Sequence, residues 1–435
     1  MADNLPTMFT VTEHVIDAQY IREYPNATVS QDSPLKLVVK KYTPTDNPNP
    51  QPGDVTIVGA HGCGLLKARL QELYEPLWEE ILVQSKQQGF RMGSIWIADV
   101  ANLGASGVVN EELLGDDPSW FDHPRDILHM INHFRHEMPR PIIGVGHSMG
   151  ATQLALLSLI HPRLFTSLVL IEPPFNQSLL TVQTFALLSI KRRDTWASRS
   201  EATKSAARSY ARWDPRVLRR WNEHGYRSLP TTIYPQTDGS TNGPVTLTGS
   251  KYQEAMLFLR PNFLGHTTSV LADSTKTPLH DPLVYPDIID PPNPSMPFYR
   301  SEAIIALKIV KHIRPPVFYL FGGESPVSTP EDQAIMLERT GAGFGGSGGV
   351  KHSQVKTATI LDCGHMVPFE NVEESASLVG TWVGQSVQRW QKDELRVHQK
   401  WSNQSTSEVL TAPAKWRPML EEFFKSQGRT ERWKI

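Results

Sequence analysis

The chain has 435 residues, of which 39% are hydrophobic and 20% are charged, and this ordinary globular composition excludes disorder over most of its length. The formal net charge is −2 with both signs interspersed, which argues against the basic stripe of a nucleic-acid-binding protein. The two cysteines, Cys63 and Cys363, are too few for a disulfide scaffold and fit a reducing compartment.

The N-terminal sequence MADNLPTMFTVTEHVID has neither the basic region nor the apolar core of a secretory signal. No apolar run in the chain approaches the roughly 18 residues that a membrane span needs. We therefore expect a soluble intracellular protein without a membrane span.

Strand-like and helix-like segments alternate along the first 174 residues. Strands are expected where apolar residues alternate or form short dense runs, and helices where they recur at helical spacing. In chain order, the expected strands are FTVTEHV, LKLVVKKY, DVTIVGAHG (54–62), SIWIADV (94–100), PIIGVGHS and LFTSLVLIEPP (164–174). The expected helices are LYEPLWEEILVQSKQ (73–87), DHPRDILHMINHFRHEM (122–138) and ATQLALLSLIHP. This alternation predicts a mainly parallel sheet with helices on both faces.

The alternation stops at residues 175–300, where a basic helical stretch precedes irregular, proline-rich sequence. An insertion of this length between strands usually forms a cap or lid. The alternation resumes with the strand PPVFYLFGG (315–323), a helix near 330–340, the glycine-rich loop GAGFGGSGG (341–349), the strand TATILDCGH (357–365) and a long closing helix. We therefore expect a core made of residues 1–174 and 301–395, a lid of residues 175–300 and a polar C-terminal arm of residues 396–435.

The sequence PIIGVGHSMGA contains the pattern G-x-S-x-G around Ser148, between a predicted strand and a predicted helix. This is the context of a nucleophile elbow, a tight turn that needs small residues at Gly146 and Gly150. Serine attacks only when a base takes its proton, and His365 lies just after the final predicted strand, where such a base is expected. His147 is interpreted only as the variable residue of the elbow.

An oxyanion hole requires backbone N–H donors after the nucleophile and in the loop after the third strand. Met149 supplies the first by position, and AHGCG (60–64) supplies the second. Cys63 is the favoured donor, with Gly62 or Gly64 as alternatives. We expect His61 to support this loop rather than to act in catalysis.

The acid that would orient His365 has two candidates. Glu324 follows the seventh predicted strand, where such an acid often lies, and Glu172 follows the sixth. Glu172 is favoured because it ends an almost wholly apolar strand, two prolines fix the exit of the chain, and a buried unpaired carboxylate would be costly. Glu324 remains the alternative acid.

Several stretches resemble the fungal α/β-hydrolases of secondary-metabolite clusters, which include the peroxisomal acyl-CoA hydrolase of mycophenolic acid biosynthesis and AK-toxin-type biosynthesis hydrolases. The stretches that carry the resemblance include HGCGLLK, GVGHSMG, HPRLFTSLVLIEP and GHMVPFE, and MINHFR followed by MPRP is far more specific than the elbow motif itself. The resemblance implies an α/β-hydrolase fold with a mostly parallel, eight-stranded sheet and a large lid after strand 6. It also implies a triad of Ser148, Glu172 and His365, with Glu where the family usually has Asp.

The same resemblance implies hydrolysis of a CoA thioester at the end of a peroxisomal chain-shortening sequence, and frequent dimerisation. The last three residues, Trp433-Lys434-Ile435, match an S-K-L-type import signal poorly. Peroxisomal localisation is therefore predicted from the family alone, with cytoplasmic localisation as the alternative.

The leading functional prediction is a serine hydrolase that cleaves an ester or acyl-CoA thioester of a natural-product intermediate through an acyl-enzyme, without a metal or cofactor. Basic residues at the base of the predicted lid, Lys191, Arg192 and Arg193, are candidate contacts for CoA phosphates. One alternative uses the same triad to transfer the acyl group to an alcohol or amine. Another is a non-hydrolytic cyclase or ligand carrier of the pathway.

Overall fold

The computed structural model describes residues 7–63, 70–175, 180–235, 243–263, 283–284, 286–287 and 297–428. The chain forms two compact units, residues 1–387 and residues 388–435. The C-terminal arm predicted at residues 396–435 falls within the second unit. The last three residues of the chain, considered above as a targeting signal, lie outside the described residues.

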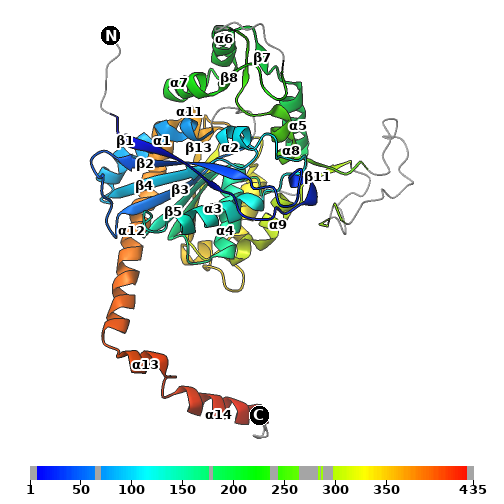
Figure 1. Cartoon of the computed structure of the whole chain (residues 1–435). Helices are drawn as coiled ribbons and strands as arrows, with labels where there is room; N and C mark the ends of the chain where they lie inside the picture. Colours follow the sequence, from blue (N-terminus) through cyan, green and yellow to red (C-terminus); the bar gives the residue numbers. More distant parts are fainter. Residues whose placement is uncertain are drawn as a thin grey trace. The chain divides into compact units, whose positions relative to one another are not determined.

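An eight-stranded sheet in the order β1-β2-β4-β3-β5-β6-β12-β13 forms the centre of the first unit (Figure 1). β2 pairs antiparallel with β1 and β4, and the remaining neighbours pair parallel. Every residue of β3, β4, β5, β6 and β12 is buried, as expected for strands covered on both faces. The predicted α/β fold is thereby confirmed. The strands are β1 Phe9–Asp17, β2 Lys36–Pro44, β3 Val55–Ala60, β4 Met92–Ala98, β5 Ile142–His147, β6 Ser167–Ile171, β12 Val317–Gly322 and β13 Val355–Ile360.

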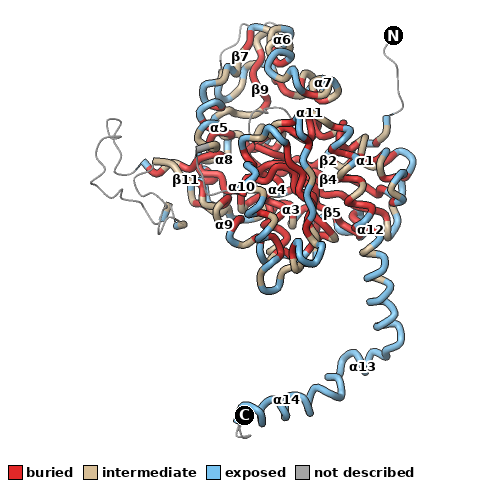
Figure 2. The backbone as a smooth tube through the Cα atoms, turned by 180° about the vertical axis from the view of Figure 1, so that it is seen from behind, coloured by how far each residue is buried: buried red, intermediate tan, exposed pale blue. Residues whose placement is uncertain are grey.

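Helices cover both faces of this sheet, and the strands between them are buried (Figure 2). An apolar core lies on each face. Residues of α1, α11 and α12 belong to one core, and residues of α3, α4, α9 and α10 belong to the other. The α-helices are α1 Glu75–Gln87, α2 Gly104–Val109, α3 Asp122–His133, α4 Met149–Ile160, α9 Ser301–Ile309, α10 Pro330–Arg339, α11 Val367–Glu370 and α12 Val372–Ser402. Short 3₁₀ helices are η1 Pro25–Ala27, η2 Leu70–Tyr74, η3 Val310–His312 and η4 Val350–His352.

The long insertion between β6 and β12 is the green part of the chain in Figure 1. It contains α5 Leu180–Lys191, β7 Thr195–Trp196, α6 Arg199–Ser209, α7 Pro215–His224, β8 Tyr226–Ser228, β9 Val245–Leu247, α8 Lys251–Phe258, β10 Arg260–Pro261 and β11 Phe298–Tyr299. β7, β9 and β8 form a small antiparallel sheet. Trp213, Trp221 and Leu257 of the insertion share one apolar core with α1 and α12, so the insertion packs on that face of the main sheet.

The second unit consists of the end of α12 followed by α13 Thr406–Leu410 and α14 Trp416–Ser426. Its described side chains are mostly exposed (Figure 2). The sequence looked poorly periodic here, yet α14 places Trp416, Met419, Leu420 and Phe423 at helical spacing. None of the helices in the described ranges combines the length and apolar character needed to cross a membrane.

Candidate active site

Ser148 lies at a sharp turn between β5 and α4. Its backbone angles, φ 54° and ψ −125°, are unusual for a residue with a side chain and are those of a strained strand-to-helix turn. The turn has no room for side chains at the neighbouring glycines. A Cβ atom at Gly150 would lie 2.2 Å from the carbonyl oxygen of Ala60, and one at Gly146 would lie 2.7 Å from the Cα atom of Ala151.

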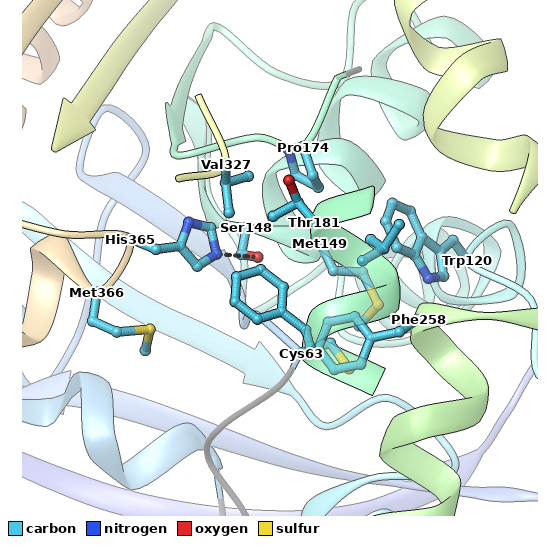
Figure 3. Close-up of a pocket in the computed structure, with 12 residues that line it drawn as sticks. Cys63, Trp120, Ser148, Met149, Pro174, Thr181, Phe258, Val327, His365 and Met366 are labelled. Atoms are coloured by element: carbon cyan, nitrogen blue, oxygen red, sulfur yellow. Dashed lines mark hydrogen bonds between the residues drawn. The ribbon is translucent and has the colours of Figure 1, made fainter. Parts of the chain in front are cut away.

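His365 lies in the loop after β13, and its imidazole is directed at Ser148 (Figure 3). Its Nε2 atom is 2.8 Å from Ser148 Oγ, and its Nδ1 atom is 2.9 Å from Glu172 Oε2. Because an ionised carboxylate can only accept, Nδ1 carries the proton that is donated to Glu172. Nε2 is then the acceptor of the Ser148 hydroxyl, so the imidazole is oriented to take the serine proton.

Glu172 follows β6 and is completely buried, with a positive φ of 51°. Its Oε1 atom accepts a hydrogen bond of 2.8 Å from the backbone N–H of Gly322. Its Oε2 atom accepts from the Ser325 hydroxyl as well as from His365. Three donors therefore satisfy the buried carboxylate and fix its direction.

Glu324 is exposed and forms an ion pair with Arg212, at 2.7 Å between Oε2 and Nη1. It lies in the turn where the alternative acid was expected, but the carboxylate that contacts His365 is that of Glu172. Ser325, the next residue, was not singled out in the sequence. Its hydroxyl reaches Glu172 because parallel pairing places β12 beside β6.

The candidate oxyanion donors lie on both sides of Ser148. Met149 is the first residue of α4, and the first N–H groups of a helix have no acceptor within the helix. Cys63 lines the same pocket as Ser148. The N–H of Gly62 is donated to the hydroxyl of Tyr74 at 3.1 Å, which leaves it unavailable for an oxyanion. Gly64, the other alternative, lies outside the described residues.

His61 supports the loop that carries Cys63. Its Nε2 atom accepts the backbone N–H of Val100 at 3.1 Å, so its Nδ1 atom carries the proton and donates to the carbonyl of Gly62 at 3.0 Å. Burial lowers the pKa of His61 to about 4, and the ring is neutral at physiological pH. The Gly62 carbonyl and the Cys63 N–H belong to one planar peptide, so this hydrogen bond also fixes the direction of the candidate donor.

The pocket beside Ser148 is almost entirely apolar, and its cavity volume is about 30 Å³. Thr181, Val182 and Phe185 of α5, together with Phe258 of α8, cover it from the insertion. Figure 3 shows its labelled side chains grouped around Ser148 and His365. The other lining residues are Cys63, Trp120, Met149, Pro174, Val327 and Met366.

A second hollow, of about 620 Å³, shares the lining residue Met366 with this pocket. We call it the basic hollow. Its charged lining residues are Lys191, Arg192, Arg208, Arg212 and Glu370.

Of the three cations singled out in the sequence, Lys191 and Arg192 line the basic hollow. Arg193 faces elsewhere: it pairs with Glu201 and borders a different hollow beside Trp196. Arg192 is mostly buried and pairs with Glu254. Arg208 and Arg212 could not be recognised as lining residues before the structure was known, because only the folding of the insertion brings them to the hollow that α5 borders.

His147, the residue before the nucleophile, is completely buried. Burial, with the nearby His365 as a smaller cause, lowers the pKa of His147 to about 3, so the ring is neutral. Its Nε2 atom is 2.9 Å from the carbonyl oxygen of His365. The elbow pattern alone gave no sign of this contact.

As the pH falls from about 6.5 to about 4, the titration of His147 lowers the free energy of unfolding of the wild type by about 1.4 kcal/mol per pH unit. The variant His147→Gln is expected to lack this loss, so the difference in free energy of unfolding shifts in favour of the variant. In this range the unfolded wild type binds a proton at His147 that the folded protein excludes, and the variant lacks this term. Urea unfolding at several pH values measures the difference. Asp99 and Asp122, whose buried carboxyls have pKa values raised to about 8 and about 7, act in the opposite direction but are common to both proteins. If the free energies of unfolding of the variant and the wild type depended on pH in the same way, the expectation would be contradicted.

Comparison with known proteins shows the family of the chain. A family model described as "Alpha/beta hydrolase family" matches residues 88–378. The type I acyl-CoA thioesterase mpaH of Penicillium roqueforti is 36% identical over 440 residues, which cover 97% of this chain and 97% of the relative. A second mpaH, from Penicillium brevicompactum, is 38% identical over 406 residues, covering 89% and 90%.

More distant proteins share part of the sequence or the fold alone. The abhydrolase domain-containing protein ACTT2-1 of Alternaria alternata is 28% identical over 248 residues, which cover 57% of this chain and 84% of the relative. Among solved structures, the peroxisomal alpha-beta-hydrolase Lpx1 of Saccharomyces cerevisiae matches with a TM-score of 0.63 and 17% identity, covering 98% of this chain and 99% of that one. This last likeness concerns the fold.

Proposed function

Because the chain belongs to the alpha/beta hydrolase family and is a homologue of type I acyl-CoA thioesterases, we propose that it hydrolyses an acyl-CoA thioester of secondary metabolism, with Ser148 as nucleophile. One observation carries the proposal. A hydrogen-bonded series runs from Glu172 through His365 to Ser148, and Ser148 and His365 line an apolar pocket that would face the acyl group.

In the proposed first step, Ser148 Oγ attacks the thioester carbonyl while His365 Nε2 takes the serine proton. The carbonyl oxygen becomes an oxyanion, which the backbone N–H groups of Met149 and Cys63 stabilise. Glu172 holds the imidazole in the required tautomer and stabilises its positive charge. The carbon–sulfur bond then breaks, the proton passes from His365 to the sulfur, and CoA leaves an acyl-enzyme.

In the second step, water replaces CoA as the partner of His365. The imidazole takes a proton from the water as its oxygen attacks the acyl-enzyme carbonyl, and the same N–H groups stabilise the second oxyanion. The bond to Ser148 Oγ breaks, the serine regains its proton from His365, and the carboxylic acid leaves. The apolar lining of the pocket favours an acyl group with an apolar portion.

The basic hollow supports CoA as the leaving group. CoA carries three phosphate groups, and the hollow contains four cations and one carboxylate. Arg192 and Arg212 already have acidic partners. Lys191 and Arg208 are exposed, and neither forms an ion pair within 4 Å with any residue that the structure describes. We therefore assign Lys191 and Arg208 as phosphate contacts.

The proposal is tested by steady-state release of CoA from a panel of acyl-CoA thioesters, followed with a thiol reagent. Hydrolysis predicts one carboxylic acid for each CoA released, and Ser148→Ala should release neither. Turnover of oxygen esters without turnover of any acyl-CoA would overturn the assignment of the thioester. An acylated product formed when an alcohol or amine is added would instead establish acyl transfer.

Replacing both Lys191 and Arg208 with glutamine is expected to raise the KM for acyl-CoA roughly tenfold and leave kcat nearly unchanged, because two exposed charge-assisted contacts to phosphate are lost. The same acyl group on N-acetylcysteamine, which has no phosphate, should show an unchanged KM. Lys204→Gln, on the exposed side of α6, is the matched control. Equal effects on the CoA and N-acetylcysteamine thioesters would contradict phosphate recognition.

A further inference from the structure

Three hydrogen bonds connect the loop after β3 to the loop that carries His365. The Gly62 N–H is 3.1 Å from the Tyr74 hydroxyl, and that hydroxyl is 2.9 Å from His147 Nδ1. His147 Nε2 is 2.9 Å from the carbonyl oxygen of His365. We call these three bonds, with the two side chains that form them, the Tyr74–His147 bridge.

The direction of every bond in the bridge follows from its ends. The His365 carbonyl can only accept, so His147 Nε2 carries a proton and donates. Since His147 is neutral, its Nδ1 atom has no proton and accepts the hydroxyl proton of Tyr74. The hydroxyl oxygen of Tyr74 is then the acceptor of the Gly62 N–H.

We propose that Tyr74 and His147 are positioning residues that hold the oxyanion loop and the base His365 in register with Ser148. The inference rests on the proposed roles of Ser148 and His365. Gly62 is joined to Cys63, the candidate oxyanion donor, and His147 is joined to Ser148. The bridge therefore connects loops from three separate strands, β3, β5 and β13, each of which supplies one part of the reaction.

The packing around the bridge limits the movement of its rings. Tyr74 and His147 are both buried, and each contacts the edge or face of Phe369, at ring-centroid distances of 4.9 Å and 5.7 Å. The ring centroids of His147 and His365 lie 5.4 Å apart. A positively charged neighbour would oppose the conversion of His365 to an imidazolium. Because His147 is neutral, it places no such charge beside His365.

The bridge also accounts for the close approach of the oxyanion loop to the nucleophile. A Cβ atom at Gly62 would lie 3.0 Å from Ser148 Cβ and 3.4 Å from His147 Nδ1. Glycine at this position lets the loop reach the elbow, and the Tyr74 hydroxyl then satisfies the N–H that the approach buries. A shift of about 1 Å in such a loop is enough to cost a large factor in rate.

Tyr74→Phe tests the inference, because it removes both hydroxyl contacts and keeps the ring. We expect kcat for acyl-CoA to fall 10- to 100-fold while KM stays within about twofold. An alkyl boronic acid, which forms a tetrahedral adduct with an active serine, should bind more weakly by a similar factor. The product carboxylic acid should bind unchanged. The matched control is Tyr319→Phe, which removes a buried hydroxyl bonded to Thr340 in the core on the other face of the sheet.

Two variants of His147 separate the halves of the bridge. His147→Gln keeps an N–H donor near the position of Nε2, and His147→Asn keeps an acceptor near the position of Nδ1 but is too short to reach His365. We expect His147→Gln to retain several-fold more kcat than His147→Asn at equal thermal stability. Wild-type kcat in Tyr74→Phe, or an equal loss in Tyr319→Phe, would overturn the inference. A separate result would show that the proposed function itself is wrong: full turnover of acyl-CoA by Ser148→Ala.

Discussion

Ser148→Ala is expected to lower kcat for acyl-CoA hydrolysis by at least about 10⁴-fold, because the substitution removes the only atom that forms the proposed acyl-enzyme. The KM should change by no more than a few-fold, since the apolar pocket and the basic hollow are untouched. Steady-state kinetics with the best acyl-CoA of the panel measures both constants. A fluorophosphonate probe should label the wild type and leave the variant unlabelled.

Ser158→Ala is the matched control for this loss. Ser158 lies on the same helix, α4, and its buried hydroxyl donates to the carbonyl of Ala155, one turn back. It should keep nearly full kcat with a thermal midpoint close to that of Ser148→Ala. If the Ser148→Ala protein retained more than about a hundredth of the wild-type kcat, Ser148 could not be the nucleophile.

Glu172→Gln is expected to lower kcat by about 10³- to 10⁴-fold, whereas Glu324→Gln should leave it within about twofold. The carboxylate of Glu172 accepts from three donors, the Gly322 N–H, the Ser325 hydroxyl and His365 Nδ1. An amide in its place must turn an N–H₂ group toward at least one of these donors. The imidazole then loses the tautomer that leaves Nε2 free to accept from Ser148.

The two glutamate variants form a matched pair, because each replaces one carboxylate by its amide and they differ in what that carboxylate contacts. Glu324 is exposed and paired with Arg212, so its loss affects a surface ion pair of small energy. The kinetics of both variants, each checked for retained thermal stability, decide which carboxylate orients the base. If Glu324→Gln lowered kcat more than Glu172→Gln did, Glu324 would be the acid that orients His365.

The sequence predicted the layers of the fold but not its details. Dense apolar runs such as those of β3 and β5 indicate strands buried on both faces, and these strands lie where the pattern places them. The final strand was extended too far: β13 ends at Ile360, and Leu361 and Asp362 are exposed before His365. The short helix α2 was missed, because GASGVV has no helical periodicity.

Parts of the site could be predicted because their chemistry is local. The spacing of glycine around Ser148 forces a turn, and the position of His365 after the last strand follows the order of the chain. Tyr74 could not be recognised, because in LYEPLW it reads as an ordinary apolar residue at the start of a helix. The role that we propose for Tyr74 depends on its hydrogen bonds to Gly62 and His147, which lie elsewhere in the sequence. A hydrophobic pattern within one segment cannot indicate contacts between separate segments.

The positive φ angles of Ser148 and Glu172 have a consequence for the evolution of this protein. Such a conformation costs on the order of 1 kcal/mol or more at a residue other than glycine. A folded domain has a net stability of only about 5–15 kcal/mol, so these two positions alone consume a noticeable part of it. The residues that we propose as nucleophile and acid are therefore two positions at which the fold carries a conformational cost. The packing of the rest of the chain must offset this cost, so a substitution that relaxed either backbone angle would be expected to raise the free energy of unfolding.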